Sequence, residues 1–286
     1  MFKKKKDQTY QSYWSISWNI FKKNKVAMVC LFIVILLCLI ALFAPLIAPY
    51  DPNKQVLTDR LMKPCGQHWF GTDDLGRDIF SRIIYGCRVS LSVGIISQII
   101  ATVIGYTMGV CAGYYGGKVD SVISFLIQVF SSFPFLLFAM AIMFVLGPGL
   151  INLYLALGLL GWASTARLIR GDVMRLKKME YIDACKVSGG NSFRIIMKHL
   201  LPNCLSTLIV TVTLGAIMSE ASLSFLGLGV KAPMASWGSM ISFSQPYIRS
   251  ATYYSVIPGL AIIITVLAFN MLGDGLRDAL DPKLRS

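Results

Sequence analysis

Ionisable and polar side chains gather in three places of this sequence, and none of them has the composition of an active site. The insert at residues 180–203 is polar and basic and lies between two long apolar segments. A second group of charges lies at residues 73–82, and Glu220 lies near the end of an apolar run. No nucleophile has an evident base, and His68 and His199 are far apart, so we expect no catalytic residue and no metal site.

The insert at residues 180–203, here called the polar knob, has the pattern of two short helices joined by a bend. Its first helix should cover residues 179–188. Gly189 and Gly190 then supply the left-handed freedom that ends a helix. Asn191 or Ser192 can cap the second helix, at 193–200, and Pro202 is expected to close it. A knob of this size is too polar for lipid and too small to fold alone, so we expect a partner protein.

Two glycine-rich stretches imitate nucleotide-binding motifs without their context. Residues 227–232 lack the preceding strand and following helix of a dinucleotide fingerprint. Residues 116–118 resemble a phosphate loop, but Val119 replaces the Ser or Thr that would bind magnesium. We therefore expect no ATP binding by that route and no cofactor in this chain.

Composition places the chain among membrane proteins. Of its 286 residues, 55% are hydrophobic and 14% charged, and the mean hydropathy is +0.64. The net charge of +13 comes from basic residues between the apolar runs, which fits membrane topology better than nucleic-acid binding. The seven cysteines form no metal motif. A disulfide between Cys65 and Cys87 stays an alternative, because both residues fall in one outer loop.

The apolar runs predict an all-α membrane protein with six transmembrane helices. The expected crossings are Val26–Ile47, Val89–Ala112, Val122–Leu146, Ile151–Ile169, Leu205–Leu223 and Val256–Leu272. With the N-terminus inside, 19 Lys and Arg residues lie on the cytoplasmic side and 8 on the other. This bias places both termini and the polar knob in the cytoplasm.

These crossings divide the chain into four parts. They are a cytoplasmic interfacial segment (1–25), the first transmembrane helix (26–48), an extracytoplasmic loop (49–88) and a core of five helices (89–286) with a cytoplasmic loop at 172–203. In the first part, lysines 3–6 and the spacing of Tyr10, Trp14, Trp18 and Phe21 favour a helix along the membrane surface. A disordered basic tail is the alternative.

Small and polar residues within the crossings predict contacts between helices. A ridge recurs at every fourth position: Ser97, Ala101, Gly105, Gly109 and Gly113. It should pack closely against another helix, in this subunit or a partner. Gln128, Glu220 and Asn270 are the candidate intramembrane or pathway polar residues, and for Glu220 pathway lining and a structural hydrogen bond are both open. Residues 224–254 are too broken to cross and suggest a re-entrant segment or lid.

The outer loop carries a charge cluster with two interpretations. Asp73, Asp74, Arg77 and Asp78 have spacings that allow internal ion pairs. The same residues could present charge to a soluble partner arriving from outside.

The polar knob resembles the "EAA" loop of permease subunits of binding-protein-dependent ABC importers. The match runs Asp183-Ala184-Cys185, Gly189 and His199-Leu200-Leu201-Pro202, with Asp183, Cys185 and His199 departing from the family's Glu, Ala and Ile. Residues 71–86, 220–230 and 267–282 resemble the dipeptide, oligopeptide and nickel branch of this family, and within it the C-type peptide permease. The resemblance implies the type I importer fold in the bacterial cell membrane. It also implies ATPase coupling through Glu180, Asp183, Ala184, Cys185, Gly189, Leu201 and Pro202.

Partners and substrate follow from the resemblance alone. It implies a second permease subunit, two ABC ATPase subunits, an extracytoplasmic binding protein and a lipid bilayer, but no nucleic acid. Peptides are the expected substrate, with nickel or another small solute as the alternative. A self-sufficient secondary transporter or channel is the rival class, but the internal repeat typical of such proteins is not evident in the sequence.

Overall fold

The computed structural model describes residues 13–211 and 215–280, and these residues are mainly helical, with one isolated β-bridge between Thr72 and Asp78. The lysines at 3–6 and Tyr10 lie outside the described residues. The helices are α1 (Tyr13–Lys23), α2 (Lys25–Leu42), α3 (Ala44–Ile47), η1 (Leu57–Asp59), α4 (Ile79–Tyr115), α5 (Gly117–Ser132), α6 (Phe135–Leu146), α7 (Leu150–Leu176), α8 (Glu180–Val187), α9 (Ser192–Ile195), η2 (Ile196–Leu200), α10 (Leu201–Thr211), α11 (Gly215–Phe225), α12 (Trp237–Ser244), η3 (Gln245–Tyr247) and α13 (Thr252–Leu280).

Three of the described helices are long and apolar enough to cross a membrane, namely α2, α4 and α13, and the bent pair α5–α6 makes a fourth if it is one span. The other two expected crossings coincide with α7 and with α10 and α11, which flank residues 212–214 outside the described part. The expected crossing at 122–146 is broken, since α5 and α6 meet at 89° beside Pro134. Proline at that point removes a backbone donor and favours an extended preceding residue, which breaks the helix.

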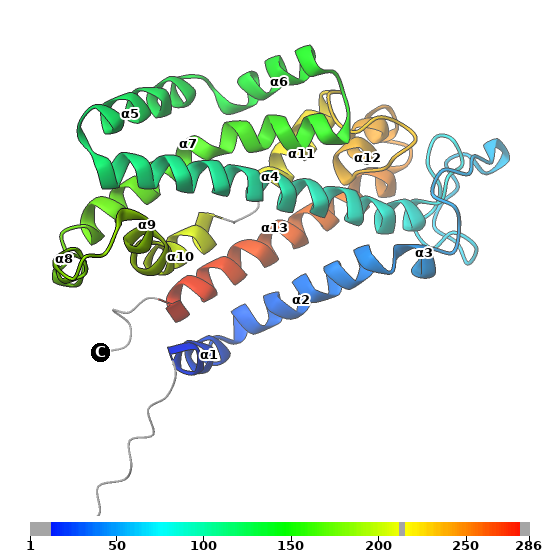
Figure 1. The fold of residues 1–286 in the computed structure, drawn as a ribbon. Helices are drawn as coiled ribbons and strands as arrows, with labels where there is room; N and C mark the ends of the chain where they lie inside the picture. The colour runs from blue at the N-terminus through cyan, green and yellow to red at the C-terminus, as the bar shows by residue number, and fades with distance from the viewer. Residues whose placement is uncertain (1–12, 212–214, 281–286) are drawn as a thin grey trace, which may run out of the picture.

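The long helices lie side by side with distinct groups at their two ends (Figure 1). The outer loop and α12 lie at one end, and α1, α8, α9 and the last turns of α13 lie at the other. This arrangement agrees with the side assigned to each segment by the basic residues. In α1, Trp18 is exposed and stacks on the buried Phe21 at 5.6 Å between ring centroids, so the aromatic residues of this helix divide between surface and core.

The ridge of small residues on α4 packs against α7, so the prediction of close packing is confirmed and the partner helix lies in the same chain. A Cβ atom added at Gly105 would lie 2.8 Å from the Trp162 carbonyl oxygen, and one at Gly109 would lie 2.7 Å from the Ala166 carbonyl oxygen. On the facing helix, a Cβ atom at Gly158 would meet Ile100 at 2.7 Å. Backbones this close leave no room for larger side chains.

A labelling experiment tests the orientation of these elements. Cys65 is exposed on the outer loop, whereas Cys185 in α8 is half-buried, so the strongly exposed Val187 is the better reporter for the knob. An impermeant maleimide should label Cys65 in intact cells and should label Val187→Cys only after the membrane is opened. A Cys65→Ser variant supplies the background. Labelling of Val187→Cys in intact cells would reverse the topology.

Candidate functional site

The first helix of the polar knob ends as the sequence predicts. The Gly190 N–H donates to the Cys185 carbonyl at 2.9 Å and the Gly189 N–H donates to the Lys186 carbonyl at 3.0 Å. This pair of hydrogen bonds is the Schellman motif. The motif needs a residue in the left-handed conformation, which Gly189 provides at φ 79°. A Cβ atom at Gly189 would meet no neighbour, so the requirement for glycine here comes from the backbone angle alone.

Buried apolar residues attach the knob to the membrane helices. Ile182, Ile195 and Leu200 are fully buried in one cluster with Ile169 and Val173 of α7. The attachment has a polar part as well, because the Tyr114 hydroxyl at the end of α4 donates to Ser192 Oγ at 3.3 Å. The knob is therefore joined to α4 and α7 together.

The second helix of the knob continues past Pro202, contrary to the expectation that this proline closes it. Five residues before α10 form the π-helical turn η2, in which the Leu201 N–H donates to the Ile196 carbonyl. Pro202 cannot donate to the Lys198 carbonyl, and the wider turn accommodates this loss without ending the helix. The next carbonyl along the chain, that of His199, accepts a hydrogen bond from the Asn203 side-chain amide at 2.7 Å.

Most of the predicted coupling residues are exposed on the knob. Glu180, Asp183, Ala184, Gly189 and Pro202 are exposed, and Leu201 is half-buried. Cys185 turns inward against the buried cluster, so this predicted coupling residue does not lie on the exposed surface with Asp183 and Ala184. Successive helix positions are about 100° apart, which separates them.

The knob also exposes large apolar side chains that its own fold does not cover. Val187 is 90% exposed and Phe193 is 72% exposed, with Tyr181 and Met197 exposed to a lesser degree. Sequence reasoning missed these residues, although two apolar residues beside the Gly-Gly bend were a usable signal. Exposed apolar groups on a polar segment are typical of a protein-binding surface.

The charged residues of the outer loop are mostly internal. Asp73 is fully buried and pairs with Arg77 Nε at 2.6 Å, while Asp78 accepts from Ser81 and lies 2.9 Å from His68 Nδ1. Only Asp74 is partly exposed. The ion-pair interpretation therefore fits the geometry, and Asp73, Arg77 and Asp78 present no docking surface in this structure.

The same loop does not hold the disulfide that its cysteines allowed. Cys65 and Cys87 are both free, and Cys87 is buried in α4 with its thiol 3.5 Å from the Leu37 carbonyl.

Glu220 is fully buried where three elements meet. Ser224 Oγ donates to one of its carboxylate oxygens at 2.6 Å, and Ser90 Oγ of α4 donates to the other at 3.3 Å. Ser90 Oγ also accepts from the Trp237 N–H at 3.3 Å, which brings in α12. This geometry favours the structural hydrogen-bonding role of Glu220 over pathway lining.

We predict that Glu220→Leu destabilises the importer, whereas Glu220→Gln retains the fold. Leucine would leave the Ser90 and Ser224 hydroxyls without their acceptor, at a cost of about 1–3 kcal/mol for each unpaired group. Glutamine keeps an acceptor oxygen. Thermal unfolding of the purified assembly would measure the difference, with Met218→Leu on the exposed side of α11 as control. Wild-type stability and uptake in Glu220→Leu would contradict the structural role.

A pocket of about 330 Å³ lies among α4, α6, α7 and α11. Its polar lining residues are Ser97, Gln98, Ser164, Thr165 and Ser219. Of these, the sequence analysis named only Ser97, as part of the ridge that packs between helices. Polar residues at similar depths in two neighbouring crossings were the available signal. The predicted pathway residues do not line it: Gln128 is exposed on α5 and Asn270 is half-buried on α13.

Comparison with known proteins places this geometry in a family. Residues 102–286 match the family described as "Binding-protein-dependent transport system inner membrane component", and residues 12–64 match the "N-terminal TM domain of oligopeptide transport permease C". The chain is 46% identical to the dipeptide transport system permease protein DppC of Bacillus subtilis (strain 168), over 96% of this chain and 87% of that protein.

Two further relatives match nearly the whole chain, and one solved structure shares its fold. The oligopeptide permease protein OppC of Bacillus subtilis is 42% identical over 96% of this chain and 91% of its own length. The glutathione permease protein GsiD of Pectobacterium atrosepticum is 41% identical over 98% and 95%. A chain of the inward-facing MetNI methionine ABC transporter has a TM-score of 0.58 at 19% identity, covering 71% of this chain and 98% of that one, and this likeness shows the type I importer fold.

The family assignment accounts for the membrane location and for the absence of an active site from the sequence, since its members are transport subunits of importers that rely on partner proteins for ATP hydrolysis and substrate capture. The chain belongs to the family of inner-membrane permease components of binding-protein-dependent ABC importers.

Proposed function

We propose that this chain imports dipeptides or oligopeptides, as one of two permease subunits that together enclose the pathway. The observation that carries the substrate class is the full-length similarity to permeases named for dipeptides, oligopeptides and glutathione. Glutathione is itself a small peptide, so these relatives agree on a peptide backbone as the cargo.

The polar knob is the proposed docking site for the ATPase subunits. Ala184 is small and exposed, and Val187 and Phe193 offer apolar surface to a groove on a partner. The buried cluster around Ile182 joins the knob to α4 and α7, so a push on the knob reaches the membrane helices. Closure of two ATPases would bring paired knobs together and switch the pathway from inward-facing to outward-facing.

The outer loop is the proposed contact for the extracytoplasmic binding protein. Because Asp73, Arg77 and Asp78 are internal, the contact would use what the loop exposes. That surface includes Leu57, Trp69, Lys54 and Lys63. The buried ion pairs would keep the loop in a fixed shape for docking.

Purification and uptake test the assignment together. The chain should co-purify with a second permease and stoichiometric ATPase, and vesicles containing the assembly should take up tri-alanine only with ATP and a loaded binding protein. A variant binding protein that cannot hold peptide is the control. Uptake driven by an ion gradient with this chain alone would contradict the proposal.

A further inference from the structure

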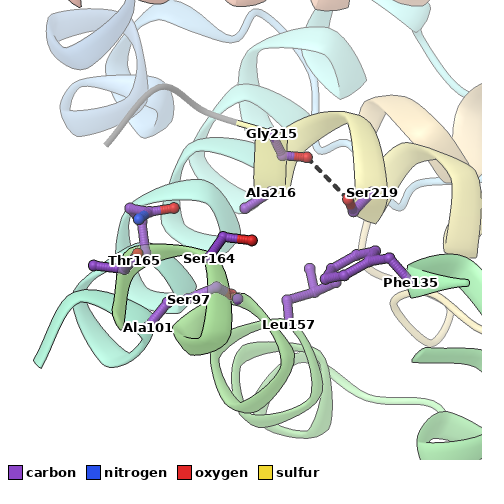
Figure 2. Close-up of a pocket in the computed structure, with 11 residues that line it drawn as sticks. Ser97, Ala101, Phe135, Leu157, Ser164, Thr165, Gly215, Ala216 and Ser219 are labelled. Carbon is purple, nitrogen blue, oxygen red and sulfur yellow. Dashed lines mark hydrogen bonds between the residues drawn. The ribbon is translucent and has the colours of Figure 1, made fainter. Parts of the chain in front are cut away.

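The pocket among α4, α6, α7 and α11 is uncharged and mostly apolar, with hydroxyl and amide groups at a few points of its wall. None of the eleven residues that line it is ionisable. Figure 2 shows Ser97, Ser164 and Thr165 toward one side of it, with Phe135 and Ser219 toward the other. Its volume is at the lower end of the range for pockets that hold small ligands.

Ser97 has a hydroxyl that the described protein atoms leave without a hydrogen-bond partner. Its Oγ is buried, and the whole residue is 1% exposed. A serine inside a helix usually satisfies its hydroxyl by bonding back to a carbonyl of the preceding turn, as Ser219 does with the Gly215 carbonyl at 2.9 Å. A buried polar group without a partner costs free energy, and such groups often mark a ligand site.

Gln98 adds a second free group at the same level of α4. Its side-chain nitrogen donates to Thr102 Oγ1 at 3.3 Å, and among the described residues its side-chain oxygen has no donor. The wall of the pocket thus contains a buried hydroxyl and, next to it in sequence, an amide oxygen. These groups complement the N–H and C=O of a peptide bond.

We infer that this pocket is a neutral subsite that binds the backbone amides of a peptide in transit, and not its charged ends. A fixed charge at membrane depth would hold a charged terminus strongly, because the local dielectric is low. Hydroxyl and amide groups bind each amide weakly and without regard to side chain. The inference rests on the proposed function of the chain as a peptide importer.

Protection from labelling tests the site directly. Ser164 is exposed and lines the pocket, so Ser164→Cys in the assembled importer should react with a maleimide. Tri-alanine, and equally its N-acetylated, C-amidated form, should slow this reaction. Ser121→Cys, at an exposed position of α5 away from the pocket, is the labelling control, and the unsubstituted importer gives the background of native cysteines.

Ser97→Ala separates a ligand role from a structural one. Loss of one neutral hydrogen bond should weaken the protection by both peptides about two- to tenfold. Since the hydroxyl has no partner in the described protein, the thermal midpoint should stay unchanged or rise. Ser222→Ala on α11, whose hydroxyl bonds back to the Met218 carbonyl, is the matched control.

Several results would overturn the subsite. They are protection that requires free termini, protection unchanged in Ser97→Ala, a lower thermal midpoint in Ser97→Ala, or a Ser164→Cys that the partner permease shields completely. Failure of the proposed function can be told apart from failure of the subsite. In that case the intact wild-type assembly would take up no peptide. Uptake of tri-alanine without protection would overturn only the subsite.

Discussion

Ala184→Trp is expected to give a normally inserted permease that neither retains its ATPases nor transports. Ala184 is exposed on α8, so an indole there would project from the knob surface and hold a docking partner away. Gly189→Val should act similarly, because a β-branched residue at φ 79° costs about 1–2 kcal/mol and redirects the bend between α8 and α9. Co-purified ATPase and ATP-driven uptake should both fall to background.

Conservative replacements at the same positions supply the controls. Ala184→Ser adds little bulk. Gly189→Asn keeps the left-handed conformation, which asparagine tolerates. Both should retain uptake. Full transport in Ala184→Trp and Gly189→Val, or loss of insertion with the ATPase contact intact, would refute the polar knob as the coupling site.

Gly109→Val should destabilise the helix pair α4–α7 more than any exposed substitution. The added Cβ atom would lie 2.7 Å from the Ala166 carbonyl oxygen and 2.9 Å from Ile169 Cβ, and backbone cannot rotate away as a side chain does. Overpacking of this kind costs about 1–3 kcal/mol or more. The amount of folded importer and its thermal midpoint should both drop.

Gly171→Val is the matched control for this change. Gly171 lies in the same pair of helices but has no atom within 4 Å of an added Cβ. The two variants therefore share the cost of valine in a helix and differ in the clash. Equal stability of the two would mean that α4 and α7 are not in direct backbone contact.

Local sequence patterns were enough to predict some parts of the fold. The left-handed Gly189 and the ridge on α4 follow from residue type and spacing, because a Gly-Gly pair after a helix and small residues every fourth position each have few structural solutions. The family motifs added the polar knob's partner class, which spacing alone could not specify.

Tertiary context decided what the sequence left open or misjudged. Whether Asp73 faces solvent depends on Arg77 and on Arg82, whose Nε lies 3.5 Å from its carboxylate, and loop composition cannot predict that burial. Pro202 continues a helix because η2 widens before it. The pocket needed four helices to be placed before Ser97 could be seen to line it.

The contact between α4 and α7 has a mechanical consequence. At 1.5 Å per residue, the 37 residues of α4 reach about 55 Å, well beyond roughly 30 Å of hydrocarbon. Tyr114 at one end of this rod contacts the knob, and Asp78 caps the other end within the outer loop. Where glycine meets backbone there is no compliant layer of side chains to absorb shear. We therefore expect the two helices to move as one rigid unit, so that under the proposed ATPase coupling a tilt at the knob would reach the outer loop with little loss.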